Sequence, residues 1–325
     1  MRALRFDRFG DLGDVLDVAD VPDPVAADGW AVIAVKAASV NPSDVKNVAG
    51  AMHWTILPRV PGRDFAGVVV AGPPEWVGVE VWGTGGDVGF TLDGSHAELI
   101  RVPVSALARK PESLSFDEAS AVGVNFVTGW LGAVETGKLE KGETIVVFGV
   151  SGGVGGAVAQ IAHSLGARVL GVDLVAPAAA TPAAAVIEEF IRIDPAAPAV
   201  GTEVRRLTGG KGAEVVYDAV GGVTTPAALD SLALRGRLVV ISAVGTRTVE
   251  IDLRDFYHRE LRLLGVDSGK VDASASAARL ALLTPRFETG EFRPLPVARH
   301  FDLADGEHAY RAVAEGTPGR VVIRP

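Results

Sequence analysis

The sequence predicts an α/β protein that combines a doubly wound parallel sheet, covered by helices on both faces, with a second, β-rich domain. Between about residues 119 and 265, apolar strands alternate with helical segments, as in Thr144–Gly149 and Arg168–Asp173 on either side of a helix expected at Gly155–Leu165. Strands that are apolar at nearly every position are buried on both faces, which is typical of parallel sheets. Residues 1–110, in contrast, contain short strands separated by glycine and proline.

Composition excludes several classes of protein. The 325 residues are enough for two domains, and a hydrophobic content of 48% is enough to bury two cores, so the chain is not intrinsically disordered. A formal net charge of −9 makes nucleic acid a poor default partner, because duplex binding needs a basic surface. The absence of cysteine excludes disulfides, thiol nucleophiles and cysteine-ligated metals. Because Met1–Asp7 is charged and no apolar run reaches membrane-helix length, we expect a cytoplasmic protein without a membrane span.

The remaining elements follow from the same signals. In the β-rich segment, strands are expected at 31–37, 67–71 and 97–102. Ser115, followed three residues later by Glu118, forms a capping box that predicts one helix from Asp117 to about Gly132. The elements expected further along are strands at 214–218 and 237–242, a helix at about 272–284 and a final strand at Gly319–Ile323.

The C-terminal stretch is too short to fold alone, so we expect it to return to the first domain. The predicted domains are residues 1–118 completed by 266–325, and residues 119–265 between them. Residues 174–200 are rich in alanine and proline, and we assign no element to them.

The strongest motif is the glycine-rich stretch Phe148–Gly156, which follows a strand and opens a helix. Glycines let the backbone approach a pyrophosphate, whose charge is stabilised by free N–H groups at a helix N-terminus. Asp173 lies 21 positions beyond Gly152, where a carboxylate accepts hydrogen bonds from an adenosine ribose. The alternative is a glycine-rich turn with an ordinary turn aspartate. A dinucleotide site is the better explanation, and its predicted residues are Val150, Ser151, Gly152, Gly153, Val154 and Asp173.

Asp173 also bears on the choice of cofactor. A carboxylate at this place repels a 2′-phosphate, so it favours NAD(H) over NADP(H). NADP(H) stays open, because a loop that folds back with Arg192 or Lys211 would reverse this preference.

Five segments together resemble one known family: Ser39–Asp44, Pro61–Val69, the glycine-rich loop, Thr208–Gly222 and Gly319–Ile323. In order and spacing they are similar to the zinc-independent branch of the medium-chain dehydrogenase/reductase superfamily, which contains zeta-crystallin-like quinone oxidoreductases and enone reductases. The resemblance covers nearly the whole chain. It implies a GroES-like catalytic domain interrupted in sequence by a Rossmann domain, with the active site in the cleft between them.

The same resemblance implies that this chain uses no catalytic metal. Zinc-dependent relatives carry metal ligands at the positions that are Asn41, Arg63 and Val124 here, and a neutral amide, a permanent cation and an alkyl group do not form a zinc site. His53 and His96 could be neighbours, but two ligands alone are not a site.

Without a metal, the acceptor must already be electrophilic, as a quinone or an α,β-unsaturated carbonyl is. By resemblance, Asn41 and Lys46 donate hydrogen bonds to the oxygen on which charge develops, and Ser43 is a weaker candidate donor. Asp44 either orients Lys46 or only caps the following helix. The structural alternatives are a turn for Asn41, a solvated surface position for Lys46 and an ion pair between Arg63 and Asp64.

The resemblance also implies the nicotinamide side of the cofactor site. By this resemblance, Thr128 lies beside the nicotinamide ring. The backbone after two later strands is expected to flank the carboxamide, at Ser242, Ala243, Val244, Val266 and Asp267. Trp54, Phe126 and Trp130 are candidate walls for a planar substrate, although aromatic residues are more often part of the core. Relatives form homodimers, often through the strand near 237–250.

Three hypotheses follow. The leading one is an NAD(P)H-dependent reductase of small-molecule quinones or enones. The second is a zinc-free NAD-dependent dehydrogenase that acts on an alcohol or an acyl thioester. The third is a nucleotide-binding regulatory protein whose nicotinamide site is vestigial.

Overall fold

The structure is a computed structural model that describes residues 1–194 and 199–325. The chain folds into two compact units, one formed by Met1–Val127 together with Ser268–Pro325 and the other by Thr128–Asp267. The C-terminal segment therefore belongs to the same unit as the N-terminal one. The predicted α/β class, with a parallel sheet in one unit and a β-rich second unit, is confirmed.

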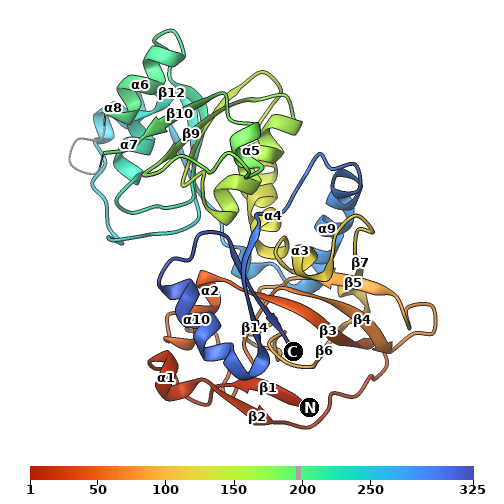
Figure 1. Ribbon diagram of the computed structural model, residues 1–325. Helices are drawn as coiled ribbons and strands as arrows, with labels where there is room; N and C mark the ends of the chain where they lie inside the picture. Colours follow the sequence, from red (N-terminus) through yellow and green to blue (C-terminus); the bar gives the residue numbers. More distant parts are fainter. Residues whose placement is uncertain (195–198) are drawn as a thin grey trace. The chain divides into compact units, whose positions relative to one another are not determined.

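The first unit is built on a seven-stranded sheet whose central strand is β3, Trp30–Val40 (Figure 1). One side of β3 pairs with β4, while its other side pairs first with β6 and then, at its end, with β15. A separate pair of strands, β1 and β2, lies near the N-terminus. The strands besides β3 are β1 (Arg2–Arg5), β2 (Asp17–Asp20), β4 (Phe65–Ala71), β5 (Glu80–Gly83), β6 (Leu99–Pro103), β7 (Ala108–Arg109), β14 (Val297–Asp302) and β15 (Arg320–Arg324).

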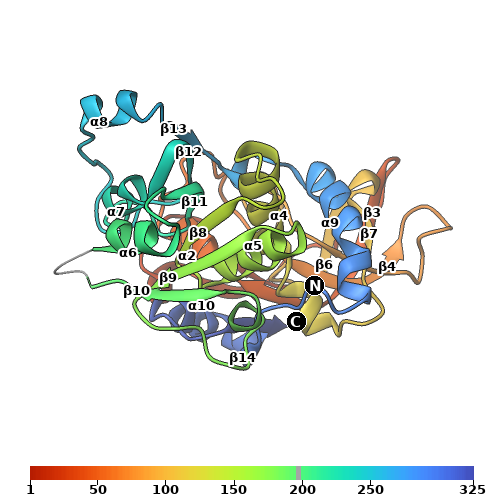
Figure 2. The ribbon, with the colours of Figure 1, turned by 90° about the horizontal axis from the view of Figure 1, so that it is seen from above.

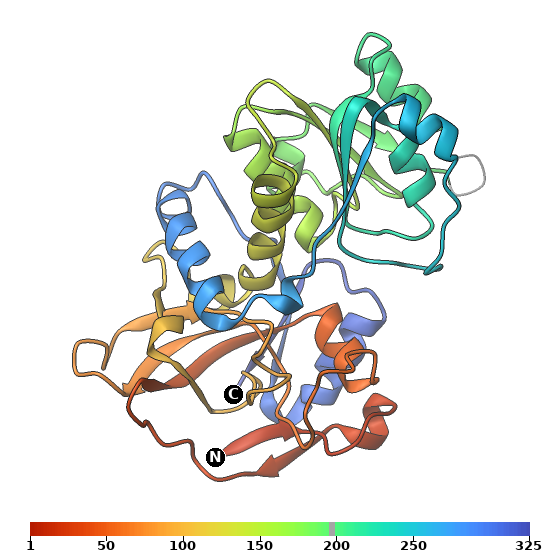
Figure 3. The same ribbon diagram turned by 180° about the vertical axis from the view of Figure 1, so that it is seen from behind.

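Helices from both ends of the chain cover this unit. Figure 3 shows α1, α2 and α10 side by side, and they enclose a core that includes Phe6, Val48 and Tyr310. Helices α3 and α9 pack against other strands of the same sheet. The helical segments are α1 (Leu12–Val15), α2 (Pro42–Val48), α3 (Phe116–Ser120), α9 (Ala273–Glu288) and α10 (Gly306–Ala314), with 3-10 turns at Val104–Ala106, Ser268–Lys270 and Leu303–Asp305.

The second unit contains a six-stranded parallel sheet in the order β10-β9-β8-β11-β12-β13, and the strands follow one another in this order across Figure 2. The order runs outward from β8 in one direction and from β11 in the other, so the switch point lies between these two strands. The strands are β8 (Thr144–Phe148), β9 (Arg168–Asp173), β10 (Glu189–Arg192), β11 (Ala213–Asp218), β12 (Leu232–Val240) and β13 (Arg262–Gly265). The helices are α5 (Gly153–Ser164), α6 (Val200–Leu207), α7 (Thr225–Asp230) and α8 (Leu253–His258), with a 3-10 turn at Ala183–Ala185.

The single helix predicted from Asp117 to Gly132 is in fact three segments: α3, then α4 (Gly123–Trp130) and then a π-helical stretch at Leu131–Thr136. The predicted capping box does open α3, since the Glu118 N–H donates to Ser115 Oγ at 3.3 Å. The helix breaks before α4, where the Val124 N–H donates to Asp64 Oδ1 at 2.9 Å. A side chain at Gly123 would collide with that same oxygen, so a tertiary contact sets the break.

Two further differences lie in the second unit. The alanine- and proline-rich stretch contributes an edge strand, β10, although residues 195–198 of that stretch lie outside the described residues. Strand β12 begins at Leu232, earlier than predicted, and pairs with β11 on one side and β13 on the other. Because both of its sides are occupied, β12 cannot join two sheets edge to edge, and the free edge on this side belongs to β13.

Within residues 1–194 and 199–325, none of the helices combines the length and the hydrophobicity that crossing a bilayer requires.

Candidate functional site

The loop between β8 and α5 is a tight glycine turn. Gly149 has a φ of +74°, which favours glycine, and its N–H donates to the Val172 carbonyl at 2.9 Å. The Gly152 N–H donates back to the Gly149 carbonyl at 3.0 Å. A side chain at Gly155 would collide with that same carbonyl oxygen. The loop therefore requires glycine at Gly149 and Gly155.

This loop presents the N-terminus of α5, a helix of 12 residues. Its N-cap is Gly152, which has no side chain to satisfy the first free N–H groups of the helix. Gly152 is exposed, and Gly153 and Val154 are half-buried, so these backbone groups are accessible. The combination of an open helix N-terminus and a close-approach loop fits a dinucleotide pyrophosphate.

Val150, one of the predicted cofactor residues, lies on the inner side of the loop. Its side chain is fully buried in the core of the second unit, and its N–H donates to the Val172 carbonyl at 3.4 Å. Val150 supports the loop from inside.

Asp173 ends β9 beside the loop. Its Oδ2 accepts a hydrogen bond from the Ser151 N–H at 3.0 Å, and its Oδ1 accepts one from the Leu174 N–H at 2.8 Å. The Ser151 hydroxyl donates to the Val175 carbonyl at 2.8 Å. The carboxylate is thus held in position, and each oxygen keeps a lone pair with which to accept a ribose hydroxyl.

The two cations that could reverse the cofactor preference lie in different places. Arg192 stands in register with Asp173 on the neighbouring strand β10, and its side chain is exposed. Lys211 precedes β11 and so lies at the amino ends of the parallel strands, opposite the end where β9 reaches Asp173. Only Arg192 is therefore placed to approach a group bound at Asp173.

The other predicted cofactor residues also follow the carboxyl ends of parallel strands, where ligands bind in doubly wound sheets. Ser242, Ala243 and Val244 follow β12, and Val266 and Asp267 follow β13.

A loop after β11 was not among the predicted site residues, although its sequence belongs to the Thr208–Gly222 segment that carried the resemblance. Gly221 has a φ of +69°, and a side chain there would collide with the Ser242 carbonyl oxygen. Buried Asp218 shapes this loop, because its carboxylate accepts the Gly221 N–H at 2.8 Å and the Thr224 hydroxyl at 2.7 Å. Asp218 thereby sets the path of backbone next to the switch point.

Thr128 lies on α4 at the start of the second unit. Its side chain is buried, and its hydroxyl has no hydrogen-bond partner among the described residues. Its carbonyl accepts a hydrogen bond from the Tyr217 hydroxyl at 3.0 Å, and burial raises the pKa of Tyr217 well above its usual range. Thr128 therefore has an unused hydroxyl and a backbone that is held in place, which suits a ligand contact.

In the first unit, the predicted catalytic residues lie at the start of α2. Asp44 is buried, and its Oδ2 accepts a hydrogen bond from the Asn41 N–H at 2.8 Å. Lys46 is exposed on the same helix, two residues on, where the two side chains do not face each other. The structure thus favours the capping role for Asp44 over the role of orienting Lys46.

Ser43 and Lys46, three residues apart, share a face of α2. The Ser43 hydroxyl is buried and has no hydrogen-bond partner within the described chain.

The side chain of Asn41 points into a buried polar network. Its Nδ2 donates to Asp64 Oδ2 at 3.0 Å, and its Oδ1 accepts from Arg320 Nη2 at 2.7 Å. Asn41 is only 2% exposed. One N–H of its amide is therefore committed to Asp64, which leaves the second N–H as the donor that could reach a substrate.

The ion pair of Asp64 is not the expected one. Its partner is Arg320, at 3.6 Å, and both side chains are buried. Arg63 instead donates to the carbonyls of Gly85 and Ser268, at 3.1 and 3.2 Å. Arg320 was not singled out as a site residue, although it belongs to the terminal Gly319–Ile323 motif.

These residues do not fit a zinc ion. Arg63 is a cation whose donors are in use, Val124 is an alkyl group, and the only acceptor oxygen of Asn41 faces a guanidinium. No cluster of three or more histidine, cysteine, aspartate or glutamate side chains suited to a metal occurs in the part of the chain described. His96 is buried against the Tyr310 hydroxyl at 2.8 Å, and burial lowers its pKa to about 4.

Two of the candidate aromatic walls have different surroundings. Phe126 packs against Phe287 and Phe292 and belongs to the core. Trp54 is half-buried, and Lys270 Nζ lies 4.6 Å from the centre of its ring. Trp54 therefore remains a candidate surface for a planar substrate.

A glycine cradle at the switch point of a doubly wound sheet, together with a second β-rich unit, defines the class of dinucleotide-dependent oxidoreductases. Comparison with known proteins agrees. Residues 27–112 match the alcohol dehydrogenase GroES-like domain, and residues 153–282 match the zinc-binding dehydrogenase family. The chain belongs to the medium-chain dehydrogenase/reductase family, as its motifs predicted.

Relatives in this family carry several activities. A zinc-type alcohol dehydrogenase-like protein of Schizosaccharomyces pombe is 34% identical over 84% of this chain and 81% of its own length. The quinone oxidoreductase of Homo sapiens is 27% identical over 92% of this chain and 90% of its length. A mycocerosic acid synthase-like polyketide synthase of Mycobacterium tuberculosis is 30% identical over 90% of this chain, but the match spans 14% of that much longer protein.

Solved structures of other proteins have a similar fold over the whole length of this chain. An NAD-dependent alcohol dehydrogenase has a TM-score of 0.89 at 29% identity, with 100% of both chains covered. A mycobacterial protein complexed with NADPH has a TM-score of 0.85 at 27% identity, again with 100% of both chains covered.

The buried position of the Asp44 carboxyl at the start of α2 can be tested through its pKa. Burial raises the pKa of this carboxyl to about 7, an effect that the nearby Asp64 carboxylate increases and that the Asn41 N–H partly opposes. In the native protein Asp44 thus keeps its proton between about pH 4 and pH 7, whereas it is ionised in the unfolded chain, so stability falls as the pH rises through this window. Asp44→Asn should remove this loss and raise the free energy of unfolding at pH 8, relative to its effect at pH 5, by about 2–3 kcal/mol. Urea unfolding of both proteins at pH 5 and pH 8 measures the effect, and an equal change at the two pH values would contradict the assignment.

Proposed function

We propose that this oxidoreductase reduces quinones or α,β-unsaturated carbonyls with NAD(P)H, by hydride transfer without a metal ion. One observation carries the proposal. The start of α2, where zinc-dependent relatives hold metal ligands, contains an amide bonded to Asp64 and Arg320, and the neighbouring Arg63 is a cation. Such a site polarises no alcohol by Lewis-acid coordination, so it suits an acceptor that is already electrophilic.

When bound, NAD(P)H supplies a hydride from C4 of its nicotinamide ring. The residues of this chain then have to stabilise the negative charge that appears on the oxygen of the acceptor. Lys46 offers an exposed ammonium, Ser43 an unpartnered hydroxyl and Asn41 its remaining N–H. Asp44, Asp64 and Arg320 are positioning residues, because they hold Asn41 and the first turn of α2.

A second candidate function is a zinc-free dehydrogenase of alcohols or acyl thioesters. The names of two similar proteins favour it, namely the zinc-type alcohol dehydrogenase-like relative and the NAD-dependent alcohol dehydrogenase structure. The third candidate, a regulatory nucleotide-binding protein, differs from both in that it would bind cofactor and reduce nothing.

For the cofactor we propose NAD(H). Asp173 carries a negative charge at the ribose position, and its oxygens are oriented by two backbone N–H groups. Arg192 is the residue that would support NADP(H), because it stands in register with Asp173.

The assembly that we propose is a cytoplasmic homodimer. Strand β13 is one of the two edge strands of the sheet, and its residue Leu263 is 44% exposed. An uncovered strand edge invites pairing with a second copy.

The function is tested by anaerobic oxidation of NADH and of NADPH with 1,4-benzoquinone, 9,10-phenanthrenequinone and 2-hexenal. We expect turnover with at least one acceptor and an unchanged rate after treatment with EDTA. Loss of activity on chelation would contradict the metal-free mechanism. Oxidation of an alcohol with NAD⁺ in place of acceptor reduction would favour the second candidate, and tight NADH binding without any reduction would favour the third.

The role of Lys46 is tested by Lys46→Met. Removing a donor to a developing oxyanion should lower kcat about 10–100-fold, while the Kd of NADH stays within about twofold. Lys36→Met is the matched control, because Lys36 is also an exposed lysine of the first unit. An unchanged kcat for Lys46→Met on the best acceptor would remove Lys46 from the site.

Cofactor choice is tested by Asp173→Ser. Removing the carboxylate relieves its repulsion of the 2′-phosphate and should shift the ratio of kcat/KM for NADPH over NADH upward by about tenfold, which corresponds to about 1.4 kcal/mol. Adding Arg192→Ala to this variant should reverse part of the shift. A ratio equal to that of the parent protein would show that Asp173 does not face the 2′ position.

A further inference from the structure

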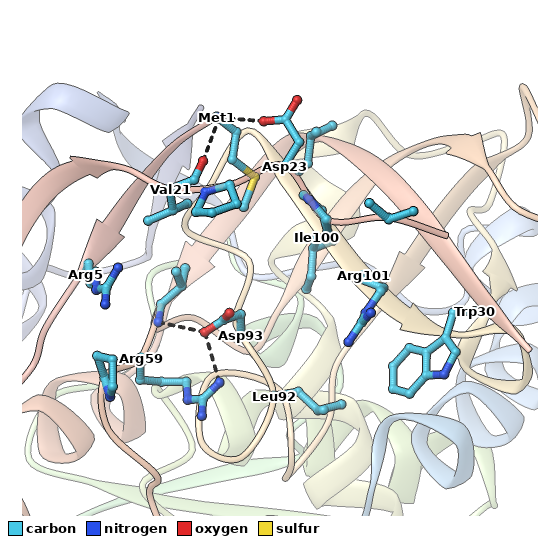
Figure 4. A pocket seen from close by; sticks show the side chains of 16 residues that line it. Met1, Arg5, Val21, Asp23, Trp30, Arg59, Leu92, Asp93, Ile100 and Arg101 are labelled. Atoms are coloured by element: carbon cyan, nitrogen blue, oxygen red, sulfur yellow. Dashed lines mark hydrogen bonds and ion pairs between the residues drawn. The ribbon is translucent and has the colours of Figure 1, made fainter. Parts of the chain in front are cut away.

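The first unit contains a pocket of about 460 Å³ near the N-terminus (Figure 4). Its lining comes from residues 1–5 at β1, from residues 21–25 before β3, from the first residue of β3, from the loops at 58–60 and 92–93, and from β6. The volume lies within the range of small-molecule sites, about 300–1,000 Å³. None of the catalytic or cofactor residues discussed above lines it.

Some of the charged groups that line this pocket have an ion-pair partner and others do not. Asp93 accepts a hydrogen bond from Arg59 Nη1 at 2.9 Å and another from the Val60 N–H at 3.2 Å. Asp23 pairs with the amino group of Met1 at 2.6 Å. Both carboxylates in the lining are therefore neutralised by neighbouring cations.

Two cations remain. Among the residues that the structure describes, neither Arg5 nor Arg101 has a carboxylate partner, and Figure 4 shows them on opposite sides of Asp93. The residues that line this pocket therefore carry more positive than negative charge, although the net charge of the whole protein is −9. This excess of positive charge favours an anion in this pocket.

The floor and walls of the pocket are apolar. Val60, Met1 and Val21 belong to a small hydrophobic cluster with Ala3 and Ala97, separate from the main core. The pocket is further lined by apolar side chains of Val25, Leu92, Leu99 and Ile100 and by prolines at positions 22, 24 and 58.

Trp30 lies at one end of the pocket, with the Arg101 guanidinium 4.7 Å from the centre of its ring. The guanidinium is thereby oriented by the indole, which reduces the entropy that it loses when it pairs with a ligand.

We propose that this pocket binds a small organic anion with an apolar body and one carboxylate group. The carboxylate is recognised by the guanidinium of Arg101, which Trp30 orients, while Arg5 adds positive charge on the other side of the pocket. The apolar body of the ligand covers the hydrophobic part of the lining. The site is independent of the proposed redox function, since it shares no residue with it.

Binding of 2-naphthoate, measured by isothermal titration calorimetry and by saturation-transfer NMR, tests the proposal. We expect a Kd between about 10 μM and 1 mM, and much weaker binding of the uncharged 2-naphthamide. The double variant Arg5→Gln/Arg101→Gln should weaken 2-naphthoate binding about tenfold.

The matched control is Arg2→Gln/Arg109→Gln, which removes the same charge. Arg109 also lies over an indole ring, that of Trp76, but neither control residue lines the pocket. The control should bind 2-naphthoate like the parent protein. Thermal unfolding of both double variants checks that they are folded.

Three results would overturn the proposal. One is equal affinity for 2-naphthoate and 2-naphthamide, and the second is equal affinity of the two double variants. The third is displacement of 2-naphthoate by saturating NADH, which would place the probe in the dinucleotide site instead.

Discussion

The buried carboxylate of Asp64 is the interaction on which the first unit depends. It accepts hydrogen bonds from Asn41 Nδ2 and from the Val124 N–H and pairs with Arg320. These partners come from the start of α2, the start of α4 and the last strand of the chain. A buried charge is costly unless such donors surround it, so the same group that holds these segments together also requires all of them to be in place.

Carboxylates act in the same way in the second unit. Asp173 holds the turn before α5 through the Ser151 N–H, and Asp218 holds the glycine turn after β11 through the Gly221 N–H. Both lie at the carboxyl ends of parallel strands. The path of the backbone in each of these glycine turns is therefore fixed by the carboxylate of a neighbouring aspartate.

The buried network around Asp64 also occupies most of the polar atoms of the amide at the start of α2. With its oxygen facing Arg320 and one N–H facing Asp64, Asn41 has no lone pair to offer a cation but keeps a donor for an oxygen atom. Arg63, which the sequence paired with Asp64, is turned toward two carbonyl groups instead. This choice of hydrogen-bond and ion-pair partners is the basis of the proposed metal-free reaction.

Local patterns were enough to predict the α/β class, the glycine loop and the capping box of α3, because each depends mainly on residues close together along the chain. The family followed from the order and spacing of five such segments. The sequence alone could not predict the break before α4 or the pairing of Asp64 with Arg320, since both arise from groups far apart in sequence. For the same reason it left open whether Asp44 caps a helix or orients Lys46, and only the direction of the side chains around α2 decided that. The edge position of β13 was likewise hidden, because strand order is a property of the assembled sheet and not of any one strand.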